Sequence, residues 1–138
     1  MKKTIFFALF LSSLLFGCKK TDKKCDLNVA NFAGSYKITA IKYKASATAT
    51  EQDLFASEPA CSKDDIIIFN ANFTTTVVDA GVKCVPPGDD TGTWSLAGST
   101  INLDGENGTV SSFDCNSATI TLVGTSQGEV TTISLAKQ

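Results

Sequence analysis

The sequence predicts an all-β protein whose main domain is an eight-stranded antiparallel up-and-down β-barrel. Three observations favour this fold: apolar and polar residues alternate in eight short segments, turn-forming residues separate these segments, and most of the connections are short. Short connections place consecutive strands side by side and antiparallel. Closing such a sheet into a barrel removes the exposed edges that an open sheet would present.

The alternating segments give the bounds of the expected strands, which are residues 35–44, 65–70, 73–79, 92–96, 100–104, 108–114, 118–124 and 130–137. Residues that favour tight turns (Asn, Asp, Gly, Pro and Ser) stand between them, at 70–72, 86–90, 97–99, 104–107 and 126–128. We therefore expect hairpin connections along most of the chain.

The connection at residues 45–63 is longer than the others. It contains Thr50-Glu51-Gln52-Asp53, a pattern typical of a helix start, and Pro59 stops any helix that follows. We expect a short helix here that covers one end of the barrel.

Alternation also predicts which side chains face the interior. On the first strand these are Tyr36, Ile38 and Ala40. On later strands they are Trp94, Leu96, Ile101, Leu103, Ile120, Leu122, Ile133 and Leu135, whereas Lys37, Thr39, Thr119 and Thr121 face outward. The expected interior is apolar, with the bulky Phe69 and Phe113 and the small or polar Ser111, Ala118 and Thr131 added to it.

The N-terminal segment has the composition of a secretion signal. Lys2 and Lys3 precede an apolar run at 5–16, which is about half of the roughly 20 residues that a membrane-spanning helix needs. The tetrad Leu15-Phe16-Gly17-Cys18 resembles the lipobox of bacterial lipoproteins, in which the cysteine receives a diacylglyceryl group and the new N-terminus is acylated, commonly with palmitate. We expect residues 1–17 to be removed and Cys18 to be lipidated. The alternative is an ordinary secretory peptide with an incidental cysteine.

Residues 18–28 are polar and Lys-rich and predict a flexible tether, which leaves 29–138 as the barrel domain. Two acyl chains or more give a stable membrane anchor. Residue 19 is Lys rather than the Asp that resembles an inner-membrane retention signal, and no acidic stretch follows Cys18. We therefore place the protein in the cell envelope, anchored in the outer membrane and facing the periplasm, with surface exposure as the alternative.

The charge of the chain excludes nucleic acid as a partner. Without residues 1–17 the chain has 10 lysines and 14 acidic residues, a formal charge of −4, and it contains no Arg. Basic residues cluster only in the expected tether, at 19–24, so the domain lacks the basic face that binds phosphates.

Once Cys18 is assigned to lipid, four cysteines remain, and in an oxidising compartment they predict two disulfides with three possible pairings. A hairpin centred near Ala71 places Cys61 opposite residue 81 or so, within reach of Cys84. Cys25 is then left to pair with Cys115. Free thiols or metal ligands are the alternative, but the chain has no His and no Cys-x-x-Cys pair.

Several segments, in this order, resemble the lipocalin-like lipoproteins of bacterial envelopes: 31–38, 53–55, 61–69, Cys84 and 92–96. The resemblance implies a calycin-type eight-stranded barrel. The chain departs from typical lipocalins in three respects, the first of which is that it lacks their Thr-Asp-Tyr type motif in a later turn. It has Tyr36 where they have Trp, and it has no Arg to pack on that residue. The resemblance therefore implies the fold rather than lipocalin transport.

Catalysis is not expected, because without His a serine would need a Lys base, and the domain has no Ser-x-x-Lys block. No cofactor and no metal are expected either. Acidic and amide residues adjoin at Asp64-Asp65, at Asp89-Asp90 and in the turn with Asp104, Glu106 and Asn107, where a calcium ion is conceivable. Solvated turn acids are the simpler interpretation.

An eight-stranded barrel is just wide enough to be filled by side chains or to hold one small ligand. We expect a non-enzymatic lipoprotein whose barrel binds a small hydrophobic or amphiphilic molecule. The candidate lining residues are Tyr36, Leu54, Phe55, Phe69, Trp94 and Phe113. The alternative is a structural or protein-interaction lipoprotein with a filled barrel and a protein partner that the sequence does not identify.

Overall fold

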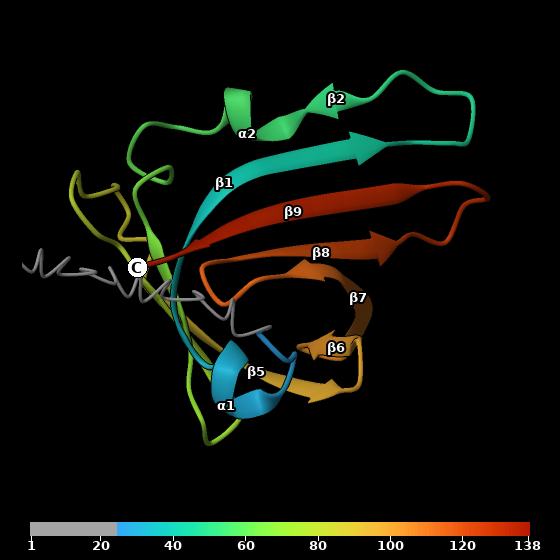
Figure 1. Ribbon diagram of the computed structural model, residues 1–138. Helices are drawn as coiled ribbons and strands as arrows, with labels where there is room; N and C mark the ends of the chain where they lie inside the picture. Colours follow the sequence, from blue (N-terminus) through green and yellow to red (C-terminus); the bar gives the residue numbers. More distant parts are fainter. Residues whose placement is uncertain (1–24) are drawn as a thin grey trace, which may run out of the picture.

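The computed structural model describes residues 25–138 and contains nine strands and two short helices in that range (Figure 1). In chain order these are α1 (Val29–Phe32), β1 (Gly34–Lys44), β2 (Gln52–Asp53), α2 (Leu54–Ser57), β3 (Ile66–Phe69), β4 (Thr74–Val78), β5 (Asp90–Ala97), β6 (Thr100–Leu103), β7 (Glu106–Phe113), β8 (Ser117–Val123) and β9 (Val130–Lys137). The expected signal peptide, Cys18 and most of the expected tether lie outside the described residues. Within 25–138, no helix has the length and apolar character needed to cross a membrane.

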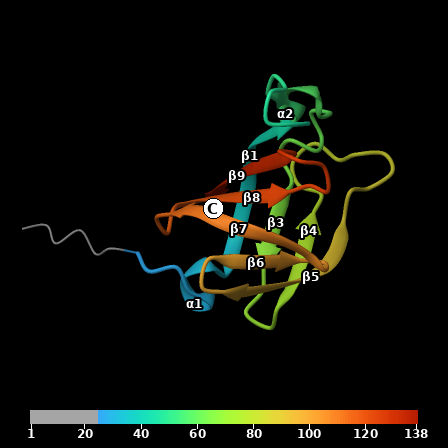
Figure 2. The same cartoon turned by 90° about the vertical axis from the view of Figure 1, so that its right-hand side faces the viewer.

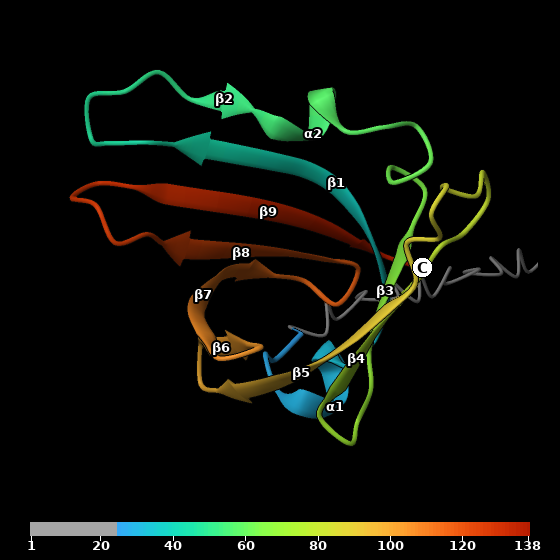
Figure 3. The same ribbon diagram turned by 180° about the vertical axis from the view of Figure 1, so that it is seen from behind.

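Eight of the strands close a barrel through antiparallel pairing of neighbours. The sheet runs from β3 to β9 in chain order, and β1 joins its two ends by pairing with both β3 and β9 (Figure 3). The expected all-β, up-and-down, eight-stranded barrel is confirmed. The ninth strand, β2, has two residues and pairs with β1 at Lys42 and Tyr43; it is too short for alternation to reveal.

The β3–β4 hairpin is centred one residue later than expected. Ile66 faces Val78, so the centre falls at Asn72 rather than Ala71. The reason is that Phe73 adopts a left-handed conformation (φ 67°) and belongs to the turn rather than to the strand. The turn is closed by a hydrogen bond from the Asn70 N–H to the Thr74 carbonyl.

A bulge in β1 changes which of its side chains face the barrel interior. The pairing with β9 skips Thr39, because Ile38 faces Leu135 and Ala40 faces Ser134. One extra residue reverses the alternation beyond it. Ile41, which faces Ile133, therefore replaces Ala40 as the inward residue, and the expectation for Ala40 is wrong.

A second bulge, in β7, moves Ser111 out of the predicted interior set. Val110 pairs with Ile120 and Ser112 with Thr119, which leaves Ser111 unpaired between them. Ser111 is exposed, and its hydroxyl donates to the Thr119 carbonyl. The expectation that Ser111 lies inside is wrong for the same reason.

One side of the barrel is filled by an aromatic cluster built around Phe32. The N-cap Asn28 starts α1 by accepting a hydrogen bond from the Asn31 N–H, and the short helix carries Phe32 into the barrel. Phe32 is fully buried, and its ring centre lies 5.1–5.7 Å from four other ring centres. We call this cluster the aromatic plug; its members are Phe32, Tyr36, Phe69, Trp94 and Phe113.

The polar atoms of the plug are satisfied by backbone carbonyls. The Tyr36 hydroxyl donates to Phe32 O (2.7 Å), and Trp94 Nε1 donates to Asn70 O (2.8 Å). Burial of the Tyr36 hydroxyl raises its pKa to about 12. The plug is therefore a packed, hydrogen-bonded core rather than an open ligand site.

The short helix expected in the long connection is present as α2. Asp53 caps it by accepting a hydrogen bond from the Ala56 N–H, and the helix ends at Ser57, before Pro59. α2 packs against β1 on the opposite side of the molecule from α1 (Figure 2). The two helices thus cover different ends of the barrel wall.

Both expected disulfides are confirmed. Cys61 is bonded to Cys84 and Cys25 to Cys115, with Cα atoms 5.2 Å and 5.7 Å apart. The second bond fixes the start of the described chain to the β7–β8 turn. Residues 25–138 therefore contain a closed barrel, its core and both disulfides, which are the elements that an independently folding domain needs.

Candidate functional site

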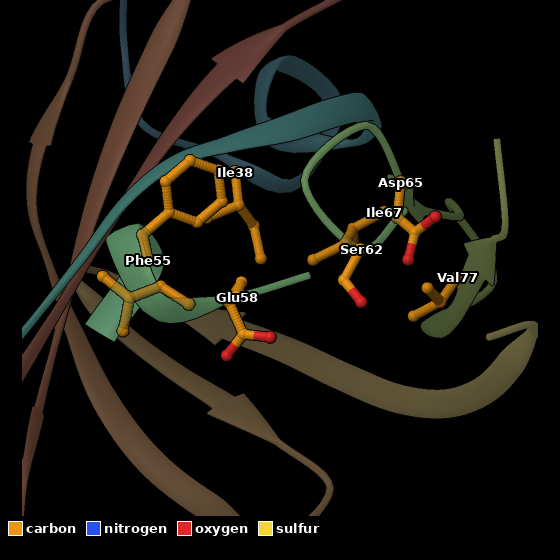
Figure 4. A pocket seen from close by; sticks show the side chains of 8 residues that line it. Ile38, Phe55, Glu58, Ser62, Asp65, Ile67 and Val77 are labelled. Atoms are coloured by element: carbon orange, nitrogen blue, oxygen red, sulfur yellow. The ribbon is translucent and has the colours of Figure 1, made fainter. Parts of the chain in front are cut away.

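A cavity lies between α2 and the wall formed by β1, β3 and β4 (Figure 4). Its volume is about 220 Å³, and it is partly open to solvent. We call it the first cavity; it is lined by Ile38, Ile41, Phe55, Glu58, Ser62, Asp65, Ile67 and Val77. Most of the lining surface is apolar, which is typical of small-molecule sites.

The first cavity exists because β1 changes partners along one of its edges. On that edge β1 pairs with β3 up to Lys37 and with β2 from Lys42, and no described residue pairs with the stretch between them. Ile38 and Ile41 lie in this stretch, and the Thr39 bulge turns Ile41 to the same side as Ile38. The space beside them is covered by α2 through Phe55.

The opposite wall of the first cavity is a cross-strand pair, Ile67 on β3 and Val77 on β4. Figure 4 shows Phe55 and Ile38 together at one side of the cavity and Ile67 and Val77 at the other, with Glu58 and Ser62 between them. The apolar side chains therefore surround the space from two sides, and polar groups line the part between.

A second, smaller cavity of about 160 Å³ shares Ile67 and Val77 with the first. Its other lining residues are Phe69, Thr75, Thr93, Leu103 and Asp104. Because Phe69 also belongs to the aromatic plug, the second cavity lies between the plug and the first cavity. The barrel is thus filled on the α1 side and hollow toward α2.

The residues predicted to line a ligand site are divided between these regions. Phe55 lines the first cavity and Phe69 the second. Tyr36, Trp94 and Phe113 pack around Phe32 and line neither cavity, and Leu54 is 37% exposed on α2. Alternation placed the large aromatics inside, but it could not show that they fill one side of the barrel.

Sequence reasoning missed most of the first cavity. Ile41 was hidden by the β1 bulge, and Glu58 and Ser62 lie in an irregular segment where alternation gives no signal. Sequence reasoning also missed Phe32 as the centre of the plug. Asn28, a favoured N-cap residue directly before α1, could have indicated the short helix that carries Phe32.

The polar side chains that line the first cavity differ in their hydrogen-bond partners. Asp65 Oδ1 accepts a hydrogen bond from the Ala80 N–H (3.2 Å), and Ser62 Oγ lies 3.6 Å from Cys84 Sγ. The Glu58 side chain makes no hydrogen bond or ion pair within residues 25–138. The cavity therefore offers two carboxylates, one of them without a partner in the described part of the chain.

The acidic residues considered for calcium act instead as acceptors for backbone N–H groups. Asp64 accepts from Val82, Asp89 from Asp79 and Asp104 from Thr93. Asp64 and Asp65 thus hold the 79–82 segment. Among the described residues, no three His, Cys, Asp or Glu side chains come together to hold a metal ion.

One buried carboxylate organises the loop between β4 and β5. Asp79 is fully buried, and its carboxylate accepts hydrogen bonds from the N–H groups of Cys84 and Gly88. Lys83 Nζ donates to the Asp79 carbonyl. With the Cys61–Cys84 bond, these contacts fix the 79–90 loop, on which Val82 (62% exposed) and Val85 (97% exposed) project to solvent.

A closed antiparallel barrel with an apolar cavity under a short helix defines a protein of the calycin class. The model of the lipocalin-like domain family matches residues 32–133, which covers most of the chain, so the chain belongs to the lipocalin-like domain family. This family fold is typically a binding fold rather than an enzymatic one. No curated protein and no solved structure matches the chain.

Proposed function

We propose that this protein is a lipoprotein of the cell envelope, anchored through lipidated Cys18, whose barrel binds a small apolar or amphiphilic molecule by non-covalent contact and without catalysis. The observation that carries the proposal is the first cavity, an apolar space beneath α2 that the aromatic plug does not fill. The N-terminal motif supports the anchor and a location in the outer membrane, facing the periplasm.

The size of the cavity limits the ligand. Cavities of about 150 Å³ lined by aliphatic side chains accept benzene, whereas sites for drug-sized ligands have about 300–1,000 Å³. A volume of about 220 Å³ lies between these values. The part of the ligand that this cavity encloses is therefore small, such as a ring with a short chain.

Native mass spectrometry of the soluble protein tests this proposal. The chain from Cys25 onward would be secreted into an oxidising compartment and sprayed without removal of lipids. We expect a bound mass that leaves on gentle activation. We expect that mass to be lost in Val77→Phe, which fills part of both cavities, and to remain in Val123→Phe, because Val123 is exposed outside them. A bare polypeptide in every preparation would contradict the proposal.

One observation favours a second candidate, a protein-interaction role. The 79–90 loop is fixed by Asp79 and the Cys61–Cys84 bond, yet it exposes Val82 and Val85. A rigid loop with exposed apolar side chains suits protein recognition. In that case the native mass shows no ligand, and Val85→Asp weakens binding to a partner protein without lowering the melting temperature.

A further inference from the structure

We infer that the first cavity selects a ligand that is positively charged as well as small and apolar, with the Glu58 carboxylate as the partner of that charge. This inference rests on the proposed ligand-binding function and deepens it. It depends on how the charged groups are distributed around the cavity.

The two ionisable side chains that line the first cavity are both acids, Glu58 and Asp65. No Lys is among its lining residues. The only ion pair among residues 25–138 is Lys42 with Asp53, which lies outside the cavity. Among the side chains that line this space, the charged groups that a ligand meets are therefore carboxylates.

Glu58 is the better partner of the two. Asp65 already accepts the Ala80 N–H and so has a role in holding the 79–90 loop. Glu58 is partly buried beside Phe55, and its carboxylate has no hydrogen-bond partner in the described chain. A carboxylate without a hydrogen-bond partner attracts a cationic donor and repels an anion.

Lys63 is a basic residue near the first cavity, and its ammonium contacts α2. Lys63 follows Ser62 in the sequence, but its ammonium donates to the Ala56 carbonyl (3.0 Å) and lies 5.8 Å from the centre of the Phe55 ring. It therefore packs on α2 and forms no ion pair with Glu58.

The charge of the whole domain acts in the same direction. Residues 25–138 contain 6 lysines and 13 acidic residues, a formal charge of −7. A negative domain raises the local concentration of small cations and lowers that of anions. Domain charge alone would act on any cation, so the experiment must separate it from a specific effect of Glu58.

Three probes with the same apolar body make this separation: phenylbutylamine, phenylbutanol and phenylbutyrate. Their affinities for the soluble protein from Cys25 onward would be measured by calorimetry or by ligand-observed NMR. We expect the amine to bind about fivefold more tightly than the alcohol, a difference that corresponds to about 1 kcal/mol. The carboxylate should bind more weakly than the alcohol.

The variant Glu58→Gln should bring the amine to the affinity of the alcohol and leave the alcohol unchanged. The matched control is Glu51→Gln, an exposed acid outside the cavity, which changes the domain charge equally and should preserve the preference. Equal binding of amine and alcohol, or an equal effect of both variants, would overturn the inference and leave the ligand-binding function intact. Failure of all three probes to bind would overturn both.

Discussion

The ammonium nitrogen of Lys137 lies 5.5 Å from the centre of the Tyr36 ring and donates a hydrogen bond to the Asn31 carbonyl (2.6 Å). The two residues face each other in the β1–β9 pair, so their side chains share a face of the sheet. A Cβ on Gly34 would lie 2.7 Å from Lys137 Cε, so glycine leaves room for the lysine stem. Typical lipocalins have a Trp at the position of Tyr36 and an Arg that packs on it. This chain has no Arg, and Lys137 is the cation that packs on the Tyr36 ring.

Removal of this cation should destabilise the barrel. In Lys137→Met the apolar stem is kept, but the contact with the Tyr36 ring and the bond to α1 are lost. We expect the free energy of unfolding to fall by about 1–2 kcal/mol, measured by urea denaturation. The control is Lys42→Met, which breaks the exposed ion pair with Asp53 and should lower the free energy of unfolding much less. Equal losses in the two variants would contradict a special role for Lys137.

Truncation of two phenylalanines should affect different properties, stability for Phe32 and ligand affinity for Phe55. Phe32→Ala removes the centre of the aromatic plug and should lower the free energy of unfolding by about 3–5 kcal/mol. Phe55→Ala removes a half-buried wall of the first cavity, so it should lower ligand affinity with a smaller loss of stability. The measurements are urea denaturation and probe binding at a temperature where both variants are folded. If Phe55→Ala bound the probes as well as the unchanged protein, the ligand would not lie in the first cavity.

Local patterns were enough to predict the barrel. The alternation and the short turns, such as 97–99 between β5 and β6, specify neighbouring antiparallel strands, and strands that pair in chain order need no long-range information. The pairing of Cys61 with Cys84 followed from the same hairpin geometry. An error of one residue in the hairpin centre did not change which cysteines met.

The candidate site could not be predicted in the same way, because it depends on departures from regular structure. The bulge at Thr39 decides whether Ala40 or Ile41 faces inward, and alternation in the sequence does not reveal a single extra residue. The contact of Lys137 with Tyr36 joins opposite ends of the domain and depends on β1–β9 register. The cavity itself depends on where β3 ends relative to β1, which is a tertiary feature.

The raised pKa of Tyr36 should make stability depend on pH in the alkaline range. Burial raises the pKa of this hydroxyl to about 12 in the folded protein, whereas an unfolded tyrosine titrates near 10. The contribution of the buried neutral hydroxyl is complete below about pH 10 and is lost as the pH rises toward about 12. Up to about 2–3 kcal/mol of unfolding free energy should disappear in this range, and Tyr36→Phe should lack this part of the loss.

Absorbance titration of tyrosinate measures the same pKa directly. The chain contains two tyrosines, so in Tyr43→Phe the signal comes from Tyr36 alone. We expect a midpoint near 12 in the folded protein. A midpoint near 10 under conditions where the circular dichroism spectrum is still native would show that the Tyr36 hydroxyl is solvated.

The proposed lipid anchor is tested by Cys18→Ser. Cys18 is the only residue to which the N-terminal motif assigns lipidation, so we expect this variant to leave the membrane fraction and to lack the acyl mass. Cell fractionation and intact mass spectrometry measure the two effects. Cys115→Ser, made together with Cys25→Ser, controls for loss of a cysteine elsewhere and should remain membrane-bound. Membrane association of Cys18→Ser without any acyl mass would contradict the anchor.

The two disulfides should differ in their contribution to stability, because they close loops of different length. The Cys61–Cys84 bond has a sequence separation of 23 and the Cys25–Cys115 bond one of 90. A cross-link lowers the entropy of the unfolded chain more when its loop is longer, which gives about 3 kcal/mol for the first bond and about 4–5 kcal/mol for the second. The paired variants Cys61→Ala/Cys84→Ala and Cys25→Ala/Cys115→Ala would be compared by urea denaturation. Because the first bond also fixes the 79–90 loop around Asp79, a larger loss in its variant would show that local packing outweighs loop length.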